Sequence, residues 1–544
     1  MLNTRFGNFL CILSSIVYLS SFLRKKPASL CLTPESGSVN LKLWVLMHSW
    51  DEPMLLHEAV LSVYRQTVGK FSVHLVVFTD RCGRPPLEST YEICTKLDDC
   101  VILRPRNTTV CPSIGSAGAK WELIEHTRSR AEPNDYITFL DGDDKYHERD
   151  TLSKIVMGTI IPQRPMFAWG IQSGRFKHQC QDIDRHVRDA ILEGTISPRS
   201  APWVYCHPRF FVAHLILALE EQSMKRNNGD WLQKATDRPL VYAALEATRG
   251  RSVAYIYSRT PHVDYRETKR NGLKRFTSHD RQEDIRAVQS LAPVTVLREK
   301  IIVVCALYNR MQTERFFEQF LLFTIPRDIE VQIHIANNSP HRQEEFQRLA
   351  GALSVEQTSF HVHNMGVNLG GMARFIVAKE LRSQFPLDFV VFIDDDQYLS
   401  GDSLLQLWQQ REKLTMTSWF GKCWRRRSDS YWSPKYGFVE IDGNQSVPRE
   451  WHYGGTGGAI VDALIFTDDR LFNIPQEYWF VEDLWLSYIL KLNGWYIKRA
   501  FIEVHMDEDE SNQGQFRALK KVKQKMFSEL NSCRFPIVPR KQCF

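Results

Sequence analysis

The sequence predicts an α/β protein in which two tandem domains each contain a Rossmann-like, mostly parallel sheet. Two similar stretches carry this prediction. Residues 389–393 form an apolar run that ends at Asp394-Asp-Asp396, and residues 136–140 form one that ends at Asp141-Gly-Asp143. Such uninterrupted runs are typical of parallel strands covered on both faces, and ligands gather at the carboxyl ends of these strands. The two stretches lie roughly 250 residues apart, which indicates an internal duplication.

Length and composition agree with two globular domains. The chain has 544 residues, more than one hydrophobic core usually supports. With 43% hydrophobic and 24% charged residues, it has the composition neither of a disordered chain nor of a polytopic membrane protein. We expect domains at residues 41–290 and 299–530, with the junction near Ala292-Pro293 after a basic, polar stretch. A formal charge of +6 without a nucleic-acid motif predicts no nucleic-acid partner.

An apolar segment at residues 6–23 predicts membrane attachment. It has Arg5 before it and Arg24-Lys-Lys26 after it, and its length is near the minimum for spanning a bilayer. A cleaved signal peptide competes with a single-pass signal anchor over residues 1–26. The lack of a small-x-small cleavage site favours the anchor. Residues 27–40, rich in Ser, Pro and Gly, then form a stem.

The twelve cysteines are too few for a disulfide scaffold and lack the Cys-x-x-Cys spacing of zinc sites. Two groups stand out, one being Cys82, Cys94, Cys100 and Cys111, and the other Cys533 and Cys543 near the C-terminus. Either group could pair in an oxidising lumen, or most cysteines could be buried free thiols.

Strands and helices are expected to alternate in each domain, as in parallel α/β sheets. The first domain has an expected strand at 43–47, helix at 55–65, strand at 71–79, helix at 118–130, acid-tipped strand at 136–140 and helix at 239–247. The second restarts this order, with a strand at 301–307, helix at 313–323, strand at 331–336, helix from Gly370-Gly371 to Leu381 and the acid-tipped strand. A glycine-rich turn at 453–461 follows, whose glycines permit close approach to a ligand or tight packing.

The two Asp-x-Asp motifs suit a hard divalent cation, Mn²⁺ or Mg²⁺. Carboxylates on alternate residues can reach the metal while substrate phosphates complete its octahedron. The candidate ligands are Asp141 and Asp143 in the first domain, and Asp394, Asp395 and Asp396 in the second. An enzyme that moves a sugar from a nucleotide diphosphate needs such a cation to neutralise the departing diphosphate.

Such an enzyme also needs a base, and three carboxylates are candidates. Glu482 and Asp483 interrupt an aromatic stretch, where poor solvation would raise their pKa values. They could instead occupy the first turn of a helix and complement its dipole. In the first domain Asp237 precedes a helix at a similar distance past its Asp-x-Asp, and it could be a base, an N-cap or both.

Each half resembles the GT-A fold glycosyltransferases, most closely family 2, whose members are generally inverting and use a metal-bound UDP-sugar or a related donor. The resemblance rests on an opening strand and loop, a second strand with a polar tip, a glycine-containing helix start and the Asp-x-Asp strand. In the second half it extends to Gly457-Gly458 and Glu482-Asp483. The other matching segments are 47–52, 78–80 and 117–120 in the first half, and 306–310, 335–338 and 368–374 in the second. Together they span nearly the whole chain after residue 40.

The resemblance implies roles for individual residues. The residues that contact the donor would be Asp51, Asp80, Lys120, Gly371 and Arg374. The metal ligands would be the five aspartates of the two motifs. The catalytic bases would be Asp237 and Asp483, with Glu482 beside Asp483. His505 resembles the late histidine that some GT-A enzymes add as a metal ligand, although a lone histidine is more often structural. The chain departs from the family in two ways. Asn337 or Asn338 replaces the second-strand acid, and the first half has no Glu-Asp pair.

The predicted function is therefore a membrane-anchored, metal-dependent, inverting glycosyltransferase with a nucleotide-sugar donor and a glycan or glycoprotein acceptor. It would be bifunctional if both domains are active. Two alternatives stay open: one domain is degenerate and binds glycan or scaffolds its neighbour, or the protein is a non-enzymatic carbohydrate- or Ca²⁺-binding protein. A Golgi or ER membrane with luminal domains is the expected location. The positive-inside rule alone would keep the domains cytoplasmic.

Overall fold

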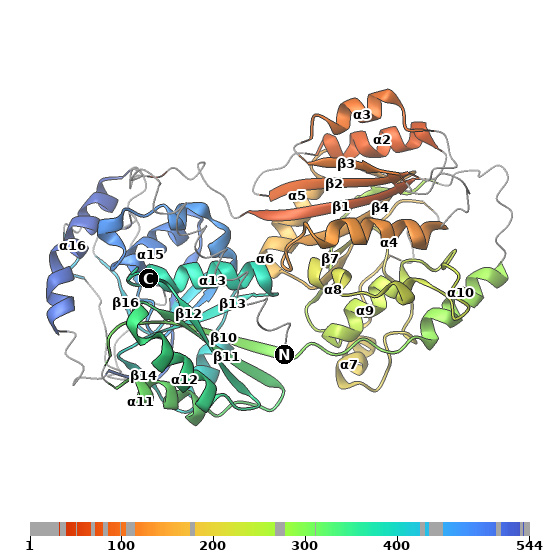
Figure 1. The fold of residues 1–544 in the computed structure, drawn as a ribbon. Coiled ribbons are helices and arrows are strands. Elements are labelled where there is room, and N and C mark those ends of the chain that lie inside the picture. The colour runs from red at the N-terminus through yellow and green to blue at the C-terminus, as the bar shows by residue number, and fades with distance from the viewer. Residues whose placement is uncertain are drawn as a thin grey trace. The chain divides into compact units, whose positions relative to one another are not determined.

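The computed structural model folds as two compact α/β units (Figure 1). The first unit comprises Asn40–Leu297 with Gln384–Pro386, and the second comprises Arg298–Ser383 with Leu387–Phe544. The structure describes residues 32, 40–49, 52–66, 71–79, 85–97, 99–104, 115–174, 180–266, 278–310, 312–424, 430–434, 450–506, 513–533 and 537.

The first unit is built on a seven-stranded sheet in the order β3-β2-β1-β4-β7-β6-β8. Its strands are β1 (Leu41–Ser49), β2 (Phe71–Thr79), β3 (Cys100–Leu103), β4 (Tyr136–Asp141), β6 (Phe167–Trp169), β7 (Arg209–Val212) and β8 (Val253–Tyr255). Neighbouring strands run parallel except at β7, which is antiparallel to β4 and β6. The central strand β1 is buried along nearly its whole length, as its apolar sequence predicts.

Helices cover both faces of this sheet. Figure 1 shows α2 (Pro53–Tyr64) and α3 (Glu88–Cys94) on one face of β1 to β3, and α4 (Gly115–Arg128) on the other. The remaining helices are α5 (Thr151–Ile155), the π-helix η2 (Val156–Ile160), α6 (Ile161–Gln163), α7 (Arg185–Glu193), α8 (Ala213–Leu217), η4 (Glu221–Met224), α9 (Arg238–Thr248) and α10 (Ser278–Ser290). The core on the α4 face is formed by alternate residues of β1, β2 and β4 with the buried sides of α4 and α9.

The second unit has a seven-stranded sheet in the order β12-β11-β10-β13-β18-β15-β19. Its strands are β10 (Glu299–Leu307), β11 (Ile329–Asn337), β12 (Thr358–Asn364), β13 (Phe389–Asp394), β15 (Thr415–Ser418), β18 (Ala459–Asp462) and β19 (Tyr496–Arg499). Neighbouring strands run parallel except at β18. Numbered along the chain within each sheet, the strands of both units follow the same spatial order, 3-2-1-4-6-5-7.

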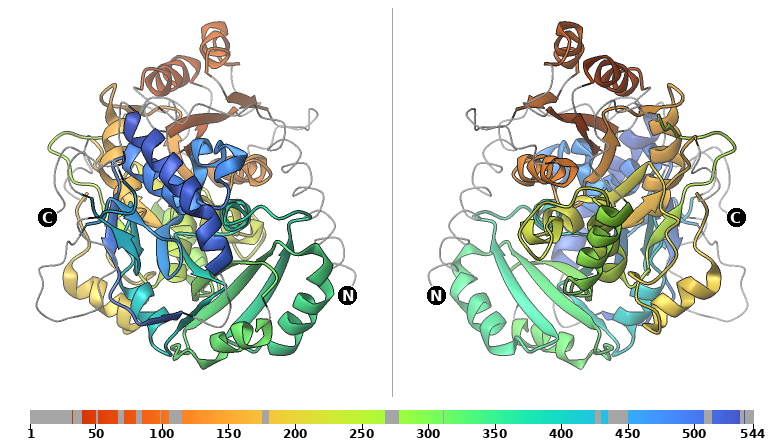
Figure 2. Two further views of the ribbon diagram at one scale, coloured as in Figure 1. Left: turned by 90° about the vertical axis from the view of Figure 1, so that its left-hand side faces the viewer. Right: turned by 90° about the vertical axis from the view of Figure 1, so that its right-hand side faces the viewer.

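The helices of the second unit also lie on both faces of the sheet. They are α11 (Thr313–Glu318), η5 (Gln319–Leu322), η6 (Pro340–Arg342), α12 (Gln343–Leu353), α13 (Met372–Gln384), α14 (Ser403–Gln409), η7 (Ala463–Thr467), η8 (Asp469–Phe472), η9 (Gln476–Tyr478), α15 (Glu482–Leu492) and α16 (Gln513–Ser532). Figure 2 shows α16, the long dark blue helix, along the surface of this unit.

A short two-stranded ladder follows the acid-tipped strand in each unit. In the first unit β5 (Lys145–Tyr146) pairs with β9 (Val263–Asp264). In the second unit β14 (Gln397–Leu399) pairs with β20 (Val504–Met506). Each ladder brings a segment from late in its unit next to the acids. A further ladder in the second unit joins β16 (Gly421–Lys422) to β17 (Tyr453–Gly454).

The prediction of an α/β protein with mostly parallel sheets is confirmed, and most expected elements are present within a few residues. The helix predicted at 55–65 begins at Pro53, because proline suits the first turn of a helix. The helix predicted at 313–323 divides into α11 and a 3₁₀ turn that ends at Leu322. Within the described residues, no helix combines the length and apolar character needed to cross a bilayer. The anchor predicted at residues 6–23 lies outside them and stays a prediction.

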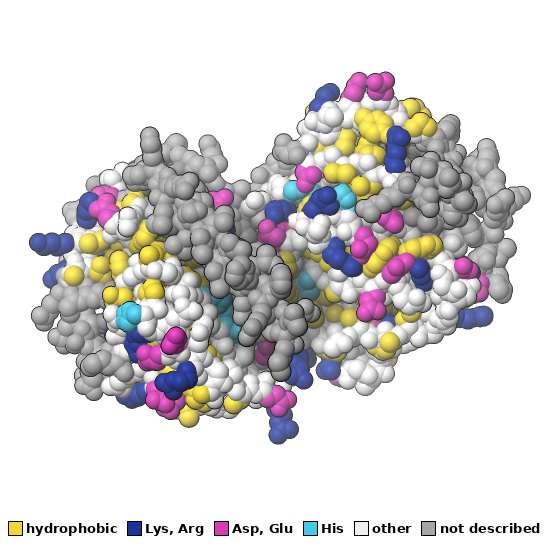
Figure 3. Space-filling view, in the orientation of Figure 1, with side chains coloured by type: hydrophobic (Ala, Val, Ile, Leu, Met, Phe, Trp, Pro, Cys, Tyr) yellow, Lys and Arg dark blue, Asp and Glu magenta, His cyan; other side chains and the backbone are white. Residues whose placement is uncertain are grey.

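Figure 3 shows basic and acidic side chains interspersed on the displayed face of the first unit. The described side chains of that face therefore favour neither sign of charge.

Three histidines stack at one edge of the second sheet. His334 on β11 is paired with His361 on β12, and His363 lies two residues further along the same face. The rings of His334 and His361 stack with centroids 4.7 Å apart, and His334 Nδ1 lies 2.9 Å from His363 Nε2. Burial lowers the pKa of all three imidazoles, to about 4 for His363, and neighbouring imidazoles lower that of His334 and His363 further.

We expect this stack to make the second unit sensitive to acid. Each folded-state pKa lies below the unfolded value of about 6.5, so as the pH falls below 6.5 the unfolded chain binds protons that the folded chain does not. The contribution of these histidines to the free energy of unfolding is therefore fully present above a pH of about 6.5 and decreases below it. For the more buried His334 and His363 it falls by up to about 1.4 kcal/mol each for every pH unit below about 6.5, whereas the exposed His361 contributes little because solvent screens it.

Urea unfolding of the wild type and of His363→Gln at pH 7.5 and pH 5.0 measures this effect. The wild type should lose more stability on acidification than the variant does. Equal losses in the two proteins would show that the stack does not control the response.

Candidate active sites at two sheet edges

Each acid cluster lies at the point where the strand order of its sheet reverses. In the first unit, β2 and β4 flank β1, and His48 at the end of β1 is paired in register with Asp141. In the second unit, β11 and β13 flank β10, and Ala306 is paired with Asp394. Ligands of open α/β sheets bind outside the carboxyl ends of strands at such a switch point. We call these edges the first site and the second site.

Three carboxylates meet at the first site. One ligand atom from each of Asp141, Asp143 and Asp144 lies within 4.8 Å of the others. Asp144 is 1% exposed, and its Oδ1 accepts a hydrogen bond of 3.1 Å from the Arg266 backbone N–H. Burial, then repulsion from Asp141 and Asp143, raises the pKa of Asp144 to about 9. Clustered carboxylate oxygens suit a hard divalent cation. Asp144 was not among the predicted ligands, although it follows Asp143 directly in the sequence.

A chain of polar contacts leads away from the acid cluster. His48 Nδ1 is 3.5 Å from Asp141 Oδ1, and His48 Nε2 is 3.0 Å from the Ser116 hydroxyl. Ser116 is in turn 3.2 Å from the hydroxyl of Thr236. Burial would raise the pKa of Asp141, but the nearby cationic groups, His48 first, outweigh it and lower the pKa. The first site is therefore a connected polar network.

Asp237 lies at the far end of this network, among three basic side chains. It forms an ion pair with the buried ammonium of Lys120, lies 2.8 Å from Arg209 and lies 3.7 Å from His207. Burial would raise its pKa, but Arg209, Lys120 and His207 together lower the pKa well below the usual value. A carboxylate with a low pKa is a weak proton acceptor. The role of Asp237 as a base stays a prediction, and its pKa counts against that role.

Lys120 was predicted to contact the donor. Its side chain is 1% exposed and donates a 3.1 Å hydrogen bond to Thr236 besides its ion pair with Asp237. In this arrangement the ammonium binds Asp237, and donor contact by Lys120 stays a prediction.

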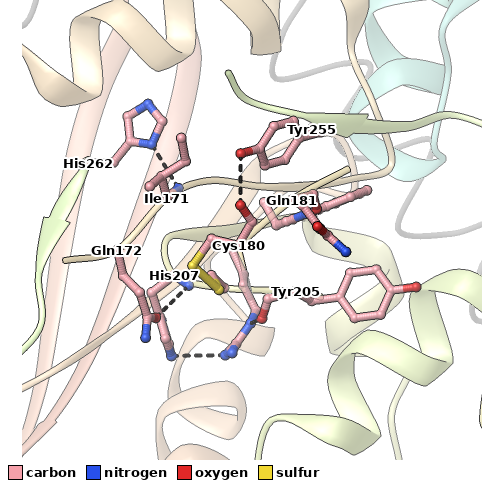
Figure 4. The surroundings of a disulfide bond; sticks show 11 residues. Ile171, Gln172, Cys180, Gln181, Tyr205, His207, Tyr255 and His262 are labelled. Atoms are coloured by element: carbon pink, nitrogen blue, oxygen red, sulfur yellow. Dashed lines mark hydrogen bonds between the residues drawn. A yellow bond between two sulfur atoms is a disulfide. The ribbon is translucent and has the colours of Figure 1, made fainter. Parts of the chain in front are cut away.

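A disulfide between Cys180 and Cys206 adjoins the residues that hold Asp237 (Figure 4). His207 follows Cys206 directly, and its backbone N–H donates a 3.1 Å hydrogen bond to Gln172 Oε1. Arg209 lies 2.9 Å from His207 Nε2 through a terminal guanidinium nitrogen, and its Nε donates to the backbone carbonyl of Tyr205. The disulfide thus fixes the segment from which His207 and Arg209 reach the first site.

We expect loss of this disulfide to destabilise the first unit. The bond closes a loop with a sequence separation of 26 residues. A disulfide that closes a loop of that size contributes about 3 kcal/mol to the free energy of unfolding. Chemical denaturation of Cys180→Ala/Cys206→Ala should show this loss. Cys94→Ala/Cys100→Ala, which opens a disulfide with a separation of only 6, should show a smaller one. Equal losses from the two pairs would contradict this assignment.

Two arginines engage the aspartate triplet at the second site. Arg374 donates to Asp394 at 2.6 Å, and Arg310 is 2.5 Å from Asp395 and 3.8 Å from Asp396. Burial would lower the pKa of Arg374, but the carboxylates of Asp394 and Glu482 outweigh it and raise the pKa. The triplet was expected to need a cation, and the guanidinium groups supply part of that charge. Among the described residues, only the first site brings three acidic or imidazole groups within 4.8 Å of one another.

Glu482 and Asp483 open α15 close to this triplet. Asp483 Oδ1 accepts a 2.8 Å bond from the Leu484 backbone, and Oδ2 accepts a bond from the Tyr453 hydroxyl and lies 3.6 Å from Lys523 Nζ. Glu482 is 5% exposed and lies 3.7 Å from Arg374. Burial, with help from Asp483 and Asp394, raises the pKa of Glu482 to about 7. A carboxyl group that titrates near neutral pH suits proton transfer.

Glycines let these carboxylates approach the backbone. A β-carbon at Gly371 would overlap the Glu482 carboxylate, and one at Gly457 would overlap Asp394 and Gln397. The glycines therefore make room for acidic side chains. Donor contact by Gly371 and Arg374 stays a prediction.

The remaining predicted ligands differ in their surroundings. His505 lies on β20 opposite Tyr398 of β14, so the ladder places it near the triplet. Its side chain is 63% exposed and lies 3.3 Å from Glu503, and metal ligation stays a prediction. Asp51 and Asp80 lie outside the described residues.

Sequence reasoning also missed several basic and phenolic partners of the acids. These are His48, His207, Arg209, Arg310, Tyr453 and Lys523. His48 and Arg310 lie in the opening loops that carried the family resemblance, but the pattern did not show their contacts.

No protein-family model matches the chain, and no curated protein matches it. Solved structures similar to this chain include residues 1–349 of S. aureus TarS, with a TM-score of 0.30 and 16% identity over 41% of this chain and 60% of that one. The same fragment in complex with UDP-GlcNAc gives a TM-score of 0.27 and 15% identity over 42% and 60%. The chain thus spans less than two thirds of the TarS fragment. Similarity at this level shows neither a shared ligand nor a shared activity.

Proposed function

We propose that this chain is a metal-dependent glycosyltransferase that moves a sugar from a nucleotide-diphosphate donor to a glycan hydroxyl. The observation that carries the proposal is the repeated architecture. Two sheets with the same strand order each place an acid cluster at the switch point, where α/β proteins bind nucleotides and related ligands. Two tandem GT-A domains would have this arrangement.

The first site supports the metal dependence. Asp141, Asp143 and Asp144 would hold Mn²⁺ or Mg²⁺, because their oxygens already lie close together. When bound, the cation supplies positive charge that neutralises the departing diphosphate. His48 orients Asp141 through their 3.5 Å contact.

The second site supports the proton transfer. The attacking acceptor hydroxyl would give its proton to the Glu482-Asp483 pair while its oxygen bonds to the anomeric carbon and the bond from that carbon to the diphosphate oxygen breaks. Such a single displacement inverts the configuration. Arg310 and Arg374 add positive charge at the end of β13, beside the expected position of the diphosphate.

The low pKa of Asp237 favours a second candidate for the first unit. Without a competent base, that unit would bind the donor or a glycan and leave transfer to the second unit. A bifunctional enzyme is the alternative.

An oxidising compartment such as the ER or Golgi lumen is part of the proposal, with attachment to the membrane through the N-terminal segment. The disulfides Cys94–Cys100 and Cys180–Cys206 support it, and Cys423 and Cys533 are disulfide-bonded as well. Cys82, Cys111 and Cys543 lie outside the described residues.

A donor screen tests the function. The full chain, produced in a secretory host, is incubated with Mn²⁺ and a panel of nucleotide sugars, with and without a mixture of glycan acceptors. We expect acceptor-stimulated release of nucleotide from one donor class. Calorimetry with UDP in the presence and absence of Mn²⁺ distinguishes an enzyme from a carbohydrate-binding protein. Failure of both experiments would reject the proposal.

A further inference from the structure

Three lysines gather on a pair of aromatic rings beside Asp483. The rings of Tyr431 and Trp432 lie edge to face, with centroids 4.9 Å apart. The ammonium of Lys422 is 3.6 Å from the Tyr431 centroid and 4.9 Å from that of Trp432. Lys523 Nζ is 5.8 Å from the Tyr431 ring, and Lys520 Nζ is 5.5 Å from the Trp432 ring. We call these five residues the lysine–aromatic cluster.

Within the described part of the chain, the three lysines of the cluster have fewer acidic partners than positive charges. Lys422 is only 8% exposed, and its ammonium donates a long hydrogen bond, 3.4 Å, to the backbone carbonyl of Tyr431. Among the described residues, one ion pair involves a lysine of this cluster. It joins Lys523 to Asp483 at 3.6 Å. Burial of a positive charge is unfavourable unless a negative charge lies nearby, so a bound anion would stabilise the cluster.

The C-terminal helix α16 builds this cluster into the second unit. Its residues Met526, Phe527 and Leu530 are fully buried, and Phe527 packs on Trp424 with ring centroids 4.6 Å apart. Gln524 Oε1 accepts a 3.0 Å hydrogen bond from the backbone of Tyr431. Lys520 is exposed, Lys523 is 16% exposed, and Lys422 on β16 is the most deeply buried of the three lysines. The cluster therefore extends from the surface to Asp483.

The position of the cluster identifies the kind of substrate group that it fits. The donor diphosphate is expected at the end of β13, where Arg310 and Arg374 already provide positive charge. Tyr431 is buried, so the partly exposed Trp432 is the ring of the cluster that can contact a sugar. We propose that the lysine–aromatic cluster is the acceptor subsite of the second unit, and that it takes an acidic saccharide with a carboxylate, sulfate or phosphate group. The proposal rests on the proposed function for the role of Asp483, whereas the ligand class rests on the cluster itself.

Calorimetry on the full chain tests this subsite through binding rather than turnover. The probes are a chondroitin sulfate tetrasaccharide, its desulfated and carboxyl-reduced neutral counterpart, and UDP. Four variants are compared with the wild type, namely Lys422→Met, Lys422→Arg, Lys520→Gln and the control Lys491→Met. Lys491 is a suitable control because burial lowers its pKa to about 8, as it does for Lys422, but it lies on α15 near Glu450.

We expect the wild type to bind the acidic tetrasaccharide roughly tenfold or more tightly than the neutral one, since charge-assisted hydrogen bonds are roughly twice as strong as neutral ones. Lys422→Met and Lys520→Gln should weaken acidic binding, while Lys422→Arg and Lys491→Met retain it. If Lys422→Met does not fold, as judged by its melting curve, the exposed Lys520→Gln decides the test.

Equal binding of the acidic and neutral probes would overturn the proposal. So would variants that weaken UDP binding and leave saccharide binding unchanged, because the subsite would then belong to the diphosphate. The chain could bind the acidic probe through its lysines and yet turn over no donor. That result would reject the proposed function but would still support the anion-binding subsite.

Discussion

Asp483→Asn should lower the rate of glycosyl transfer by the second unit by roughly a thousandfold, in the middle of the 10²- to 10⁴-fold contribution of a positioned base. Asparagine keeps the size of the side chain, and its amide oxygen can still accept the hydrogen bond that the Leu484 backbone donates to Oδ1. Its NH2 group would then face the Tyr453 hydroxyl, whose oxygen can accept a hydrogen bond. The change therefore removes proton acceptance and leaves the packing intact. The kcat of transfer, measured in an Asp143→Ala background that silences the first site, should fall while the KM for the donor changes little.

Two further variants show whether the loss belongs to Asp483. Asp469→Asn alters an exposed aspartate of the same unit that binds Lys379, and it should leave the rate unchanged. Glu482→Gln decides which acid of the pair is the base. If Glu482 accepts the proton, its pKa of about 7 predicts that the wild-type rate rises as the pH increases through 7. In that case Glu482→Gln, and not Asp483→Asn, would cause the thousandfold loss.

The sequence predicts the fold well because the apolar pattern of a buried strand can be recognised within a few neighbouring residues. Residues 389–393 and 136–140 are apolar without alternation, and they form the buried parallel strands β13 and β4. The acids at the ends of these strands reach the switch points because the registers of β1 with β4 and of β10 with β13 fix them there.

Charge compensation at the acids depends on contacts between distant residues, which spacing does not encode. The triplet Asp394-Asp-Asp396 is the stronger metal motif in the sequence because it has one more acid than Asp141-Gly-Asp143. In the structure Arg310 and Arg374 reach the triplet, whereas Asp144 joins the first cluster and strengthens it. In the same way, Asp237 follows the spacing of a base, but Lys120, Arg209 and His207 surround it.

This asymmetry leads to the second large expected effect. Asp143→Ala should weaken Mn²⁺ binding to the full chain by roughly a hundredfold or more, since even the loss of an outer-shell partner of a metal ligand costs 10- to 100-fold. The reason is that one oxygen from each of the three first-site carboxylates lies within 4.8 Å of the others, so all three can share one cation. Calorimetric titration of Mn²⁺ into the full chain should give one strong site per chain, which Asp143→Ala abolishes.

Asp396→Ala provides the matched comparison at the second site. Arg310, 3.8 Å from Asp396 and 2.5 Å from Asp395, already compensates negative charge there, so loss of Asp396 should alter strong Mn²⁺ binding little. Asp150→Asn alters a half-exposed aspartate of the first unit that binds Lys154, and it controls for a general loss of acidic charge. Two strong Mn²⁺ sites per chain, lost one at a time with Asp143→Ala and Asp396→Ala, would mean that Mn²⁺ displaces both arginines from the triplet. In that case the second unit would be as metal-dependent as the first.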